Sequence, residues 1–185
     1  MKHSTTTTTT MISATLLSLL LLFLTVHLAG AQANIQDTCK SAAAANSVIN
    51  YDFCVNTFLR NPKSGSVDTR GLASIAALTS VNQAYNVKDN INNLLGNSPD
   101  PPTKTGLDQC MSLYTSMLDT LAQAVDAING KQDDNAKGLL NTAIQAAQNC
   151  EAGFGQAGAA SPLTQGNNDS VELSSMALAI LGLAN

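Results

Sequence analysis

Four cysteines, Cys39, Cys54, Cys110 and Cys150, are the side chains whose type and spacing bear first on chemistry. A zinc site built from cysteine wants close pairs such as Cys-x2-Cys, and a redox centre wants Cys-x-x-Cys near a strand. The nearest two cysteines here are fifteen residues apart, so neither pattern is present. Four well-separated cysteines in an exported chain favour two disulfides, for which three pairings exist.

Histidine, the commonest catalytic base, occurs only near the start of the chain, as His3 and His27. After a polar start that contains six threonines, residues 11–30 form an almost uninterrupted apolar run, which ends at the small residues Ala29-Gly30-Ala31. We interpret residues 1–31 as a secretory signal peptide. A retained membrane anchor is the alternative, but the run lacks a basic cytoplasmic flank. The expected mature chain, residues 32–185, would be secreted to the apoplast and cell wall without membrane attachment.

The expected mature chain contains few side chains that could act as catalytic groups. Without histidine, Ser-His-Asp and Cys-His catalysis and any histidine-bearing zinc site are excluded. Its acids are scattered singly apart from Asp133-Asp134, so paired carboxylates would have to converge from distant segments. Eight basic and thirteen acidic side chains give residues 32–185 a net charge of −5, which disfavours nucleic acid as a partner. We expect no enzyme activity, no cofactor and no metal.

The elements that position these cysteines are expected to be helices. Proline and glycine are few, and apolar residues recur at intervals of three and four in several long segments. A break of sequence NGKQDD separates two of these stripes and predicts an antiparallel helical hairpin. The fold class is predicted to be all-α, an up-down four-helix bundle preceded by an N-terminal helical hairpin. The expected helices span residues 35–45, 51–60, 68–95, 107–128, 136–154 and 170–183.

Helix geometry selects among the cysteine pairings. Cys110 lies twenty residues before Gly130 and Cys150 lies twenty residues after it. At a rise of 1.5 Å per residue, both lie about 30 Å from the turn, at the same height on antiparallel helices. Cys39 and Cys54 each lie seven residues from the break between the two short helices. We therefore predict the pairs Cys39–Cys54 and Cys110–Cys150.

Taken in order, these features resemble the plant invertase and pectin methylesterase inhibitor family. The stretches that carry the resemblance are NYDFCVNTF, LDQCMSLYTSMLDTLAQAVDAI, NTAIQAAQNCEAGF and SPLTQGN. The likeness covers residues 34–183 and is strongest to a branch of pollen allergens named as invertase inhibitors. It implies a four-helix bundle with an N-terminal hairpin, two sequential disulfides, and one-to-one inhibition of a cell-wall enzyme.

The resemblance also bears on which enzyme is inhibited. Invertase inhibitors of this family carry a Pro-Lys-Phe motif near the start of the helix that holds the last cysteine. The corresponding stretch here is Asp133-Asp134-Asn135, without the lysine or the aromatic residue. Pectin methylesterase is therefore the main expected target, bound by a bundle face that covers its substrate cleft. The outward polar residues expected on that face are Lys88, Asn92, Ser112, Ser116, Asp119, Gln123 and Asp126.

Other interpretations stay open at this point. The target could be acid invertase, or the protein could be a non-inhibitory secreted bundle such as a ligand carrier or an allergen-like protein. Asn168 begins the sequon Asn168-Asp169-Ser170, a glycosylation candidate expected in an exposed loop, although Asn168 or Asp169 could instead cap the last helix. Gly138, inside a helical stripe, could mark close packing between helices.

Overall fold

The computed structural model describes residues 33–184, and the expected signal peptide at residues 1–31 lies outside them. The described residues are helical, as predicted. They form α2 (Ile35–Ala45), α3 (Tyr51–Leu59), the short 3-10 helix η1 (Ser64–Ser66), α4 (Thr69–Gly96), α5 (Pro101–Asn129), α6 (Asp133–Ala157) and α7 (Thr164–Leu183). Within this part of the chain, no helix has the length and apolarity needed to cross a bilayer.

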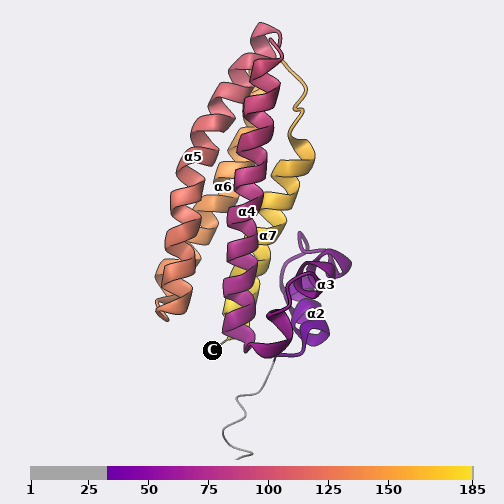
Figure 1. The fold of residues 1–185 in the computed structure, drawn as a ribbon, viewed down its shortest axis with the longest axis vertical. Helices are drawn as coiled ribbons and strands as arrows, with labels where there is room; N and C mark the ends of the chain where they lie inside the picture. Colours follow the sequence, from indigo (N-terminus) through magenta and orange to yellow (C-terminus); the bar gives the residue numbers. More distant parts are fainter. Residues whose placement is uncertain (1–32, 185) are drawn as a thin grey trace, which may run out of the picture. The chain divides into compact units, whose positions relative to one another are not determined.

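The four long helices close into a bundle, which confirms the predicted architecture (Figure 1). Helix α4 packs along α5 and α7, and α6 packs along the same two helices. The α2–α3 hairpin lies outside the bundle, where α2 contacts α7 and α3 contacts α4 (Figure 1). The bundle is therefore a long body that carries a small appendage on one side.

Side-chain caps fix where four of the helices begin. The side chains of Asn34, Asn50, Asp68 and Asp100 each accept the backbone N–H of the residue three positions later, which starts α2, α3, α4 and α5 respectively. Such caps satisfy backbone donors that have no partner inside the helix.

Three helices begin earlier than the apolar pattern predicts, and one of them is α6, which starts at Asp133 and not at Ala136. Helix α5 starts at Pro101 and not near Leu107, because Asp100 caps it and its prolines occupy the first turn, where no backbone donor is needed. Helix α7 starts at Thr164, six residues before the predicted Ser170, and no side chain caps it. Polar first turns hide such starts from a search for apolar periodicity.

The two disulfides are those predicted from helix height. Cys39–Cys54 joins α2 to α3 with its Cα atoms 5.7 Å apart, and Cys110–Cys150 joins α5 to α6 with its Cα atoms 4.7 Å apart. All four cysteines are fully buried. One disulfide therefore links the two helices of the hairpin, and the other links two helices of the bundle.

Candidate functional site

Five of the seven residues predicted to meet a partner lie in one stripe along α5. Ser112, Ser116, Asp119, Gln123 and Asp126 follow one another at intervals of four and three, and all are exposed. Residues at these intervals share one face of a helix. The structure therefore brings these five side chains together on the solvent side of α5.

The other two predicted residues lie on the neighbouring helix. Lys88 is half-buried and Asn92 is exposed, one turn apart on α4, which packs along α5. We use the name α4–α5 face for the exposed surface of these two helices. It comprises Leu78, Tyr85, Lys88, Asp89 and Asn92 of α4 together with Ser112, Ser116, Asp119, Gln123 and Asp126 of α5. That this face binds a partner stays a prediction.

Three residues of this face, Leu78, Tyr85 and Asp89, are absent from the predicted set. Leu78 follows Leu72 and Ile75 at the spacing of three that predicts a core position, but it is 48% exposed, and Tyr85 is 55% exposed. Near Leu78, the core side of α4 is instead occupied by the small residues Ala76, Ala77 and Ser80, which are fully buried. These small residues already keep the spacing of three and four, and that signal in the sequence could have shown that Leu78 points outward.

Hydroxyl groups on α5 are turned toward their own helix. Thr115 donates to the carbonyl of Met111 at 2.7 Å, and Ser116 donates to the carbonyl of Leu113 at 3.0 Å. Thr120 likewise donates to the carbonyl of Ser116 at 3.0 Å. Hydroxyls that are satisfied in this way offer a partner fewer free donors. The stripe on α5 therefore presents two serines, of which Ser116 is already bonded to its own helix, together with Gln123 and two carboxylates.

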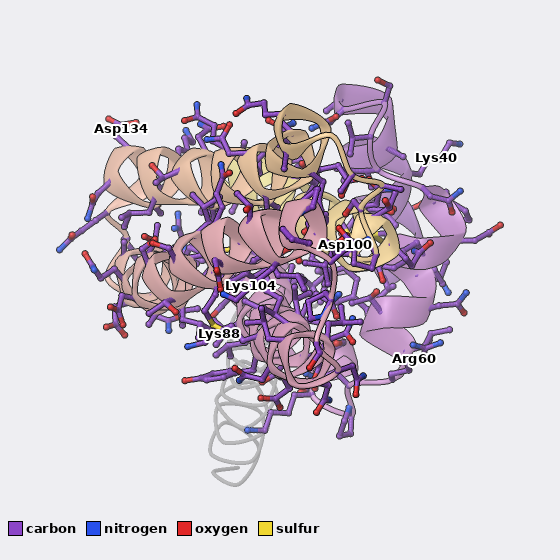
Figure 2. All side chains as sticks on the ribbon, turned by 90° about the horizontal axis from the view of Figure 1, so that it is seen from above. Lys40, Arg60, Lys88, Asp100, Lys104 and Asp134 are labelled. Carbon is purple, nitrogen blue, oxygen red and sulfur yellow. A yellow bond between two sulfur atoms is a disulfide. The ribbon has the colours of Figure 1, made fainter. Side chains whose placement is uncertain are left out.

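Charge is distributed unevenly over the described residues. The segment 33–67 carries three bases and two acids, whereas 68–184 carries five bases and eleven acids. Figure 2 shows Lys40 and Arg60 on the hairpin side, away from Lys88 and Lys104 on the bundle. Lys104 is held by Asp108 at 2.6 Å. The bundle is therefore acidic, with a net charge of −6, and its α4–α5 face shares that character.

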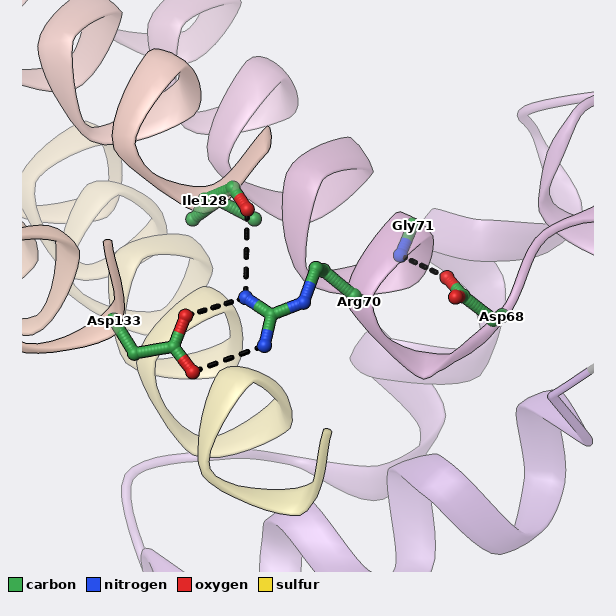
Figure 3. Close-up of polar contacts among 5 residues, drawn as sticks. All are labelled: Asp68, Arg70, Gly71, Ile128 and Asp133. Carbon is green, nitrogen blue, oxygen red and sulfur yellow. Dashed lines mark hydrogen bonds and ion pairs between the residues drawn. The ribbon is translucent and has the colours of Figure 1, made fainter. Parts of the chain in front are cut away.

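The stretch Asp133-Asp134-Asn135 replaces the Pro-Lys-Phe motif and begins α6. One of its three side chains, that of Asp133, is bound within the protein. The Asp133 carboxylate accepts two hydrogen bonds from Arg70, at 2.5 and 2.9 Å (Figure 3). Arg70 also donates to the carbonyl of Ile128 at 3.4 Å, and its hydrogen bond to Asp133 raises the pKa of the guanidinium above its ordinary value. Arg70, on α4, thus fastens the turn between α5 and α6.

A buried polar network joins α5, α6 and α7. The hydroxyl of Tyr114, which is fully buried, donates to Asn167 Oδ1 at 2.8 Å and also lies 3.1 Å from Ser170 Oγ. Asn167 Nδ2 donates to the Glu151 carboxylate at 2.6 Å, and Thr164 Oγ1 donates to the other oxygen at 2.6 Å. Burial raises the pKa of Tyr114 to about 12, so this phenol stays a neutral donor. Satisfied networks of this kind rigidify a core.

The glycosylation candidate Asn168 lies neither in a loop nor at a cap. It is exposed in the second turn of α7, which begins at Thr164. Ser170, the third residue of the sequon, is fully buried, and its hydroxyl donates to the carbonyl of Gly166 at 2.8 Å. Both placements expected from the sequence are therefore wrong. Modification of Asn168 stays a prediction.

The described residues show surface hollows that are open to solvent. One hollow of about 360 Å³ lies between α6 and α7 and includes Glu151, Asn167 and Asn168. A smaller one of about 230 Å³ lies at the end of the bundle beside Gln123 and Asp126. Neither is an enclosed apolar cavity of the kind that a ligand carrier would need. Within residues 33–184, no group of His, Cys, Asp or Glu side chains is arranged to hold a metal ion.

Comparison with known proteins places the whole described region in one group. The family model described as plant invertase/pectin methylesterase inhibitor matches residues 33–180. A protein of Platanus orientalis named "Putative invertase inhibitor" is 34% identical over 150 residues, which cover 80% of this chain and 88% of that protein. Pectinesterase inhibitor 8 of Oryza sativa subsp. japonica is 30% identical over 159 residues, which cover 83% of this chain and 85% of the relative.

A solved structure supports the fold independently. The crystal structure of a mutant form of a pectin methylesterase inhibitor from Arabidopsis matches with a TM-score of 0.65 over 77% of this chain and 97% of the other. The two sequences are only 16% identical. At that identity the match indicates a shared fold and does not indicate a shared target.

Proposed function

Because the chain belongs to the plant invertase/pectin methylesterase inhibitor family, we propose that it is a secreted inhibitor of a cell-wall carbohydrate-active enzyme. The observation that carries this proposal is the family match across residues 33–180, nearly the whole described bundle and hairpin. The mechanism is stoichiometric occlusion, in which one inhibitor covers the substrate cleft of one enzyme molecule. A body pinned by two disulfides favours this mechanism, since little conformational freedom is lost on binding.

The first candidate target is acid invertase. This choice departs from the expectation of pectin methylesterase, and the name of the relative that is 34% identical supports it. The missing Pro-Lys-Phe motif then means that invertase would be contacted by other residues. Asp134 and Asn135 are exposed at the start of α6 and are available for such contact.

Pectin methylesterase is the second candidate, and one observation favours it. Asp133 occupies the first position of the altered motif and is bound by Arg70, so its side chain is directed back into the bundle. A side chain held in this way cannot extend into an active site. This fits an inhibitor that binds through the side of its bundle, and a relative 30% identical is named a pectinesterase inhibitor.

A titration against both enzymes tests the proposal. A fixed amount of purified acid invertase or pectin methylesterase is mixed with increasing mature protein at mildly acidic pH, and residual activity is measured. We expect invertase activity to fall linearly to an endpoint near one inhibitor per enzyme, and preincubation with substrate to slow the loss, because occlusion and substrate compete. Loss of pectin methylesterase activity alone would move the target to the second candidate. Full activity of both enzymes at saturating protein would contradict the proposed function.

A further inference from the structure

Exposed large apolar side chains are rare on the sides of the described bundle. Apart from Leu183 near the end of α7, only Leu78 and Tyr85 of the four long helices belong to this class, and both lie on α4. They are seven residues apart, so they lie on the same face of the helix, two turns from each other. The Tyr85 hydroxyl forms no hydrogen bond with any described residue.

The orientation of Tyr85 follows from its neighbours. Gln83, two residues earlier and rotated by about 200°, donates to the carbonyl of Gly166 on α7 at 3.3 Å. Tyr85 therefore points away from the α7 side of α4. It lies twelve residues before Asn97 at the end of α4, and Ser112 lies twelve residues after Asp100 at the start of α5, which places both at about the same height.

The same count applies to Leu78, which lies nineteen residues before Asn97, and to Asp119, which lies nineteen residues after Asp100. Tyr85 therefore lies level with the first residue of the stripe on α5 and Leu78 level with its middle residue, so both lie between the heights of Asn92 and Asp126. The two apolar side chains give the α4–α5 face an apolar centre within an otherwise polar surface. An apolar centre with a polar rim is the usual anatomy of a protein interface.

Charges on this face indicate the kind of partner. The carboxylates of Asp89, Asp119 and Asp126 form no hydrogen bond or ion pair with any described residue, and Lys88 is the sole base of the face as defined above. Unpaired carboxylates around an apolar centre complement a surface that carries lysine or arginine. They would speed the encounter with a basic protein more than they would strengthen the final complex.

We propose that the α4–α5 face binds the target enzyme and that Tyr85, supported by Leu78, contributes most of the binding energy as the anchor residue of this face. This inference rests on the proposed function, since the partner is the enzyme that the protein inhibits. Tyrosine is among the residue types that dominate binding energy at interfaces, because its ring buries a large area with little loss of side-chain freedom. The partner is expected to offer a recess for the ring, rimmed by basic side chains.

The test compares Tyr85→Ala with Tyr51→Ala. Tyr51 is 41% exposed on α3, so it is a matched tyrosine outside the face. Both variants should keep the helical circular dichroism and thermal midpoint of the parent, since both side chains are exposed and alanine favours helix. For whichever enzyme the parent inhibits in the titration, Tyr85→Ala should raise Kd at least about 30-fold, as expected for a hot-spot residue. Tyr51→Ala should change Kd less than about 3-fold, in the range of surface substitutions.

Two further outcomes complete the design. Tyr85→Phe should retain most of the affinity if the ring is the anchor. Neutralising the three carboxylates by Asp89→Asn, Asp119→Asn and Asp126→Asn should slow association at low salt while dissociation changes little. Parent-like Kd for Tyr85→Ala, with the parent still inhibiting, would overturn the anchor and leave the proposed function intact. A parent that inhibits neither enzyme would overturn both.

Discussion

Gly106 shows how one hydrogen atom in place of a side chain sets a distance between helices. It is buried on α5, and a Cβ atom built there would lie 2.5 Å from Cδ1 and 2.9 Å from Cγ of Phe154 on α6. Phe154 is itself fully buried, so its ring has little room to move aside. Gly138, which the sequence suggested as the close-packing glycine, has no atom within 4 Å of such a Cβ. That interpretation was wrong. Close contacts between helices lie instead at Gly106, at Gly153 of α6 against Gln109, and at Gly166 of α7 against Val87.

This contrast gives a prediction at the scale of one residue. Gly106→Ala should lower the free energy of unfolding by about 1–2 kcal/mol, because overpacking of about 1–3 kcal/mol exceeds the gain in helix propensity. Gly138→Ala, the matched control, should raise it by about 0.5–1 kcal/mol, because alanine fits an open helical position better than glycine. Urea denaturation measures both. Equal effects of the two substitutions would show that Phe154 yields freely.

At the scale of the elements, two glutamates tie helices together with opposite responses to pH. Burial raises the pKa of Glu151, but side-chain hydrogen bonds with Thr164, Asn167 and Ser161 together outweigh burial and leave the pKa below its ordinary value. Burial raises the pKa of Glu172, and here the hydrogen bond from the Asn50 backbone, at 2.7 Å, does not reverse the effect. Glu151 lies in the network between α6 and α7, and Glu172 connects α7 to the start of α3.

The sign of each pH effect follows from these directions. A lowered folded pKa means that ionised Glu151 stabilises the fold above its unfolded pKa of about 4.3, and that this stabilisation is lost as the pH falls through the folded pKa. Glu151→Gln should therefore be destabilising at pH 7, by an amount that shrinks below about pH 4.3. The measurement is the thermal midpoint of parent and variant from pH 3 to pH 7.

Glu172→Gln is the control for that series. Because the folded pKa of Glu172 is raised, its carboxyl favours the fold most at low pH, and this advantage is lost as the pH rises through the folded pKa. The difference between parent and Glu172→Gln should therefore run in the opposite direction along the same pH range. A parallel trend for the two variants would mean that overall charge, and not the named hydrogen bonds, governs the response.

At the scale of the whole molecule, the hairpin and the bundle are pinned separately. Cys39–Cys54 spans fifteen residues and lies wholly within the hairpin, whereas Cys110–Cys150 spans forty residues and lies within the bundle. In the chain-entropy model these loops stabilise the folded state by about 3 and 4 kcal/mol respectively. The hairpin touches the bundle only through α2 with α7 and α3 with α4, apart from the short η1 segment and minor contacts.

Removal of each disulfide should therefore destabilise a different part of the protein. The double variant Cys110→Ser, Cys150→Ser should lower the free energy of unfolding of the bundle by about 4 kcal/mol. Cys39→Ser with Cys54→Ser should instead expose the amides of α2 and α3 to hydrogen exchange while the four long helices stay protected, because local opening follows the weakest contacts. Hydrogen exchange by mass spectrometry distinguishes the two. Loss of protection throughout the bundle in the hairpin variant would contradict this division.

Much of this protein could be predicted from its sequence alone. Apolar spacing of three and four fixed the number and direction of the long helices, and helix rise paired Cys110 with Cys150 before any tertiary contact was known. These features depend on backbone geometry that repeats along the chain, so local residue types determine them. Exposure of the α5 stripe followed for the same reason. Its members are separated by whole turns from one another and lie opposite the apolar stripe.

Other features were decided only by the tertiary structure. The direction of the Asp133 side chain depends on Arg70, sixty-three residues earlier in the chain. How much space a glycine has for a Cβ atom depends on which side chain of the neighbouring helix packs against it, as the Phe154 ring packs against Gly106. Each of these is a contact between distant positions, and a periodic pattern within one helix contains no information about the rotation of its neighbours.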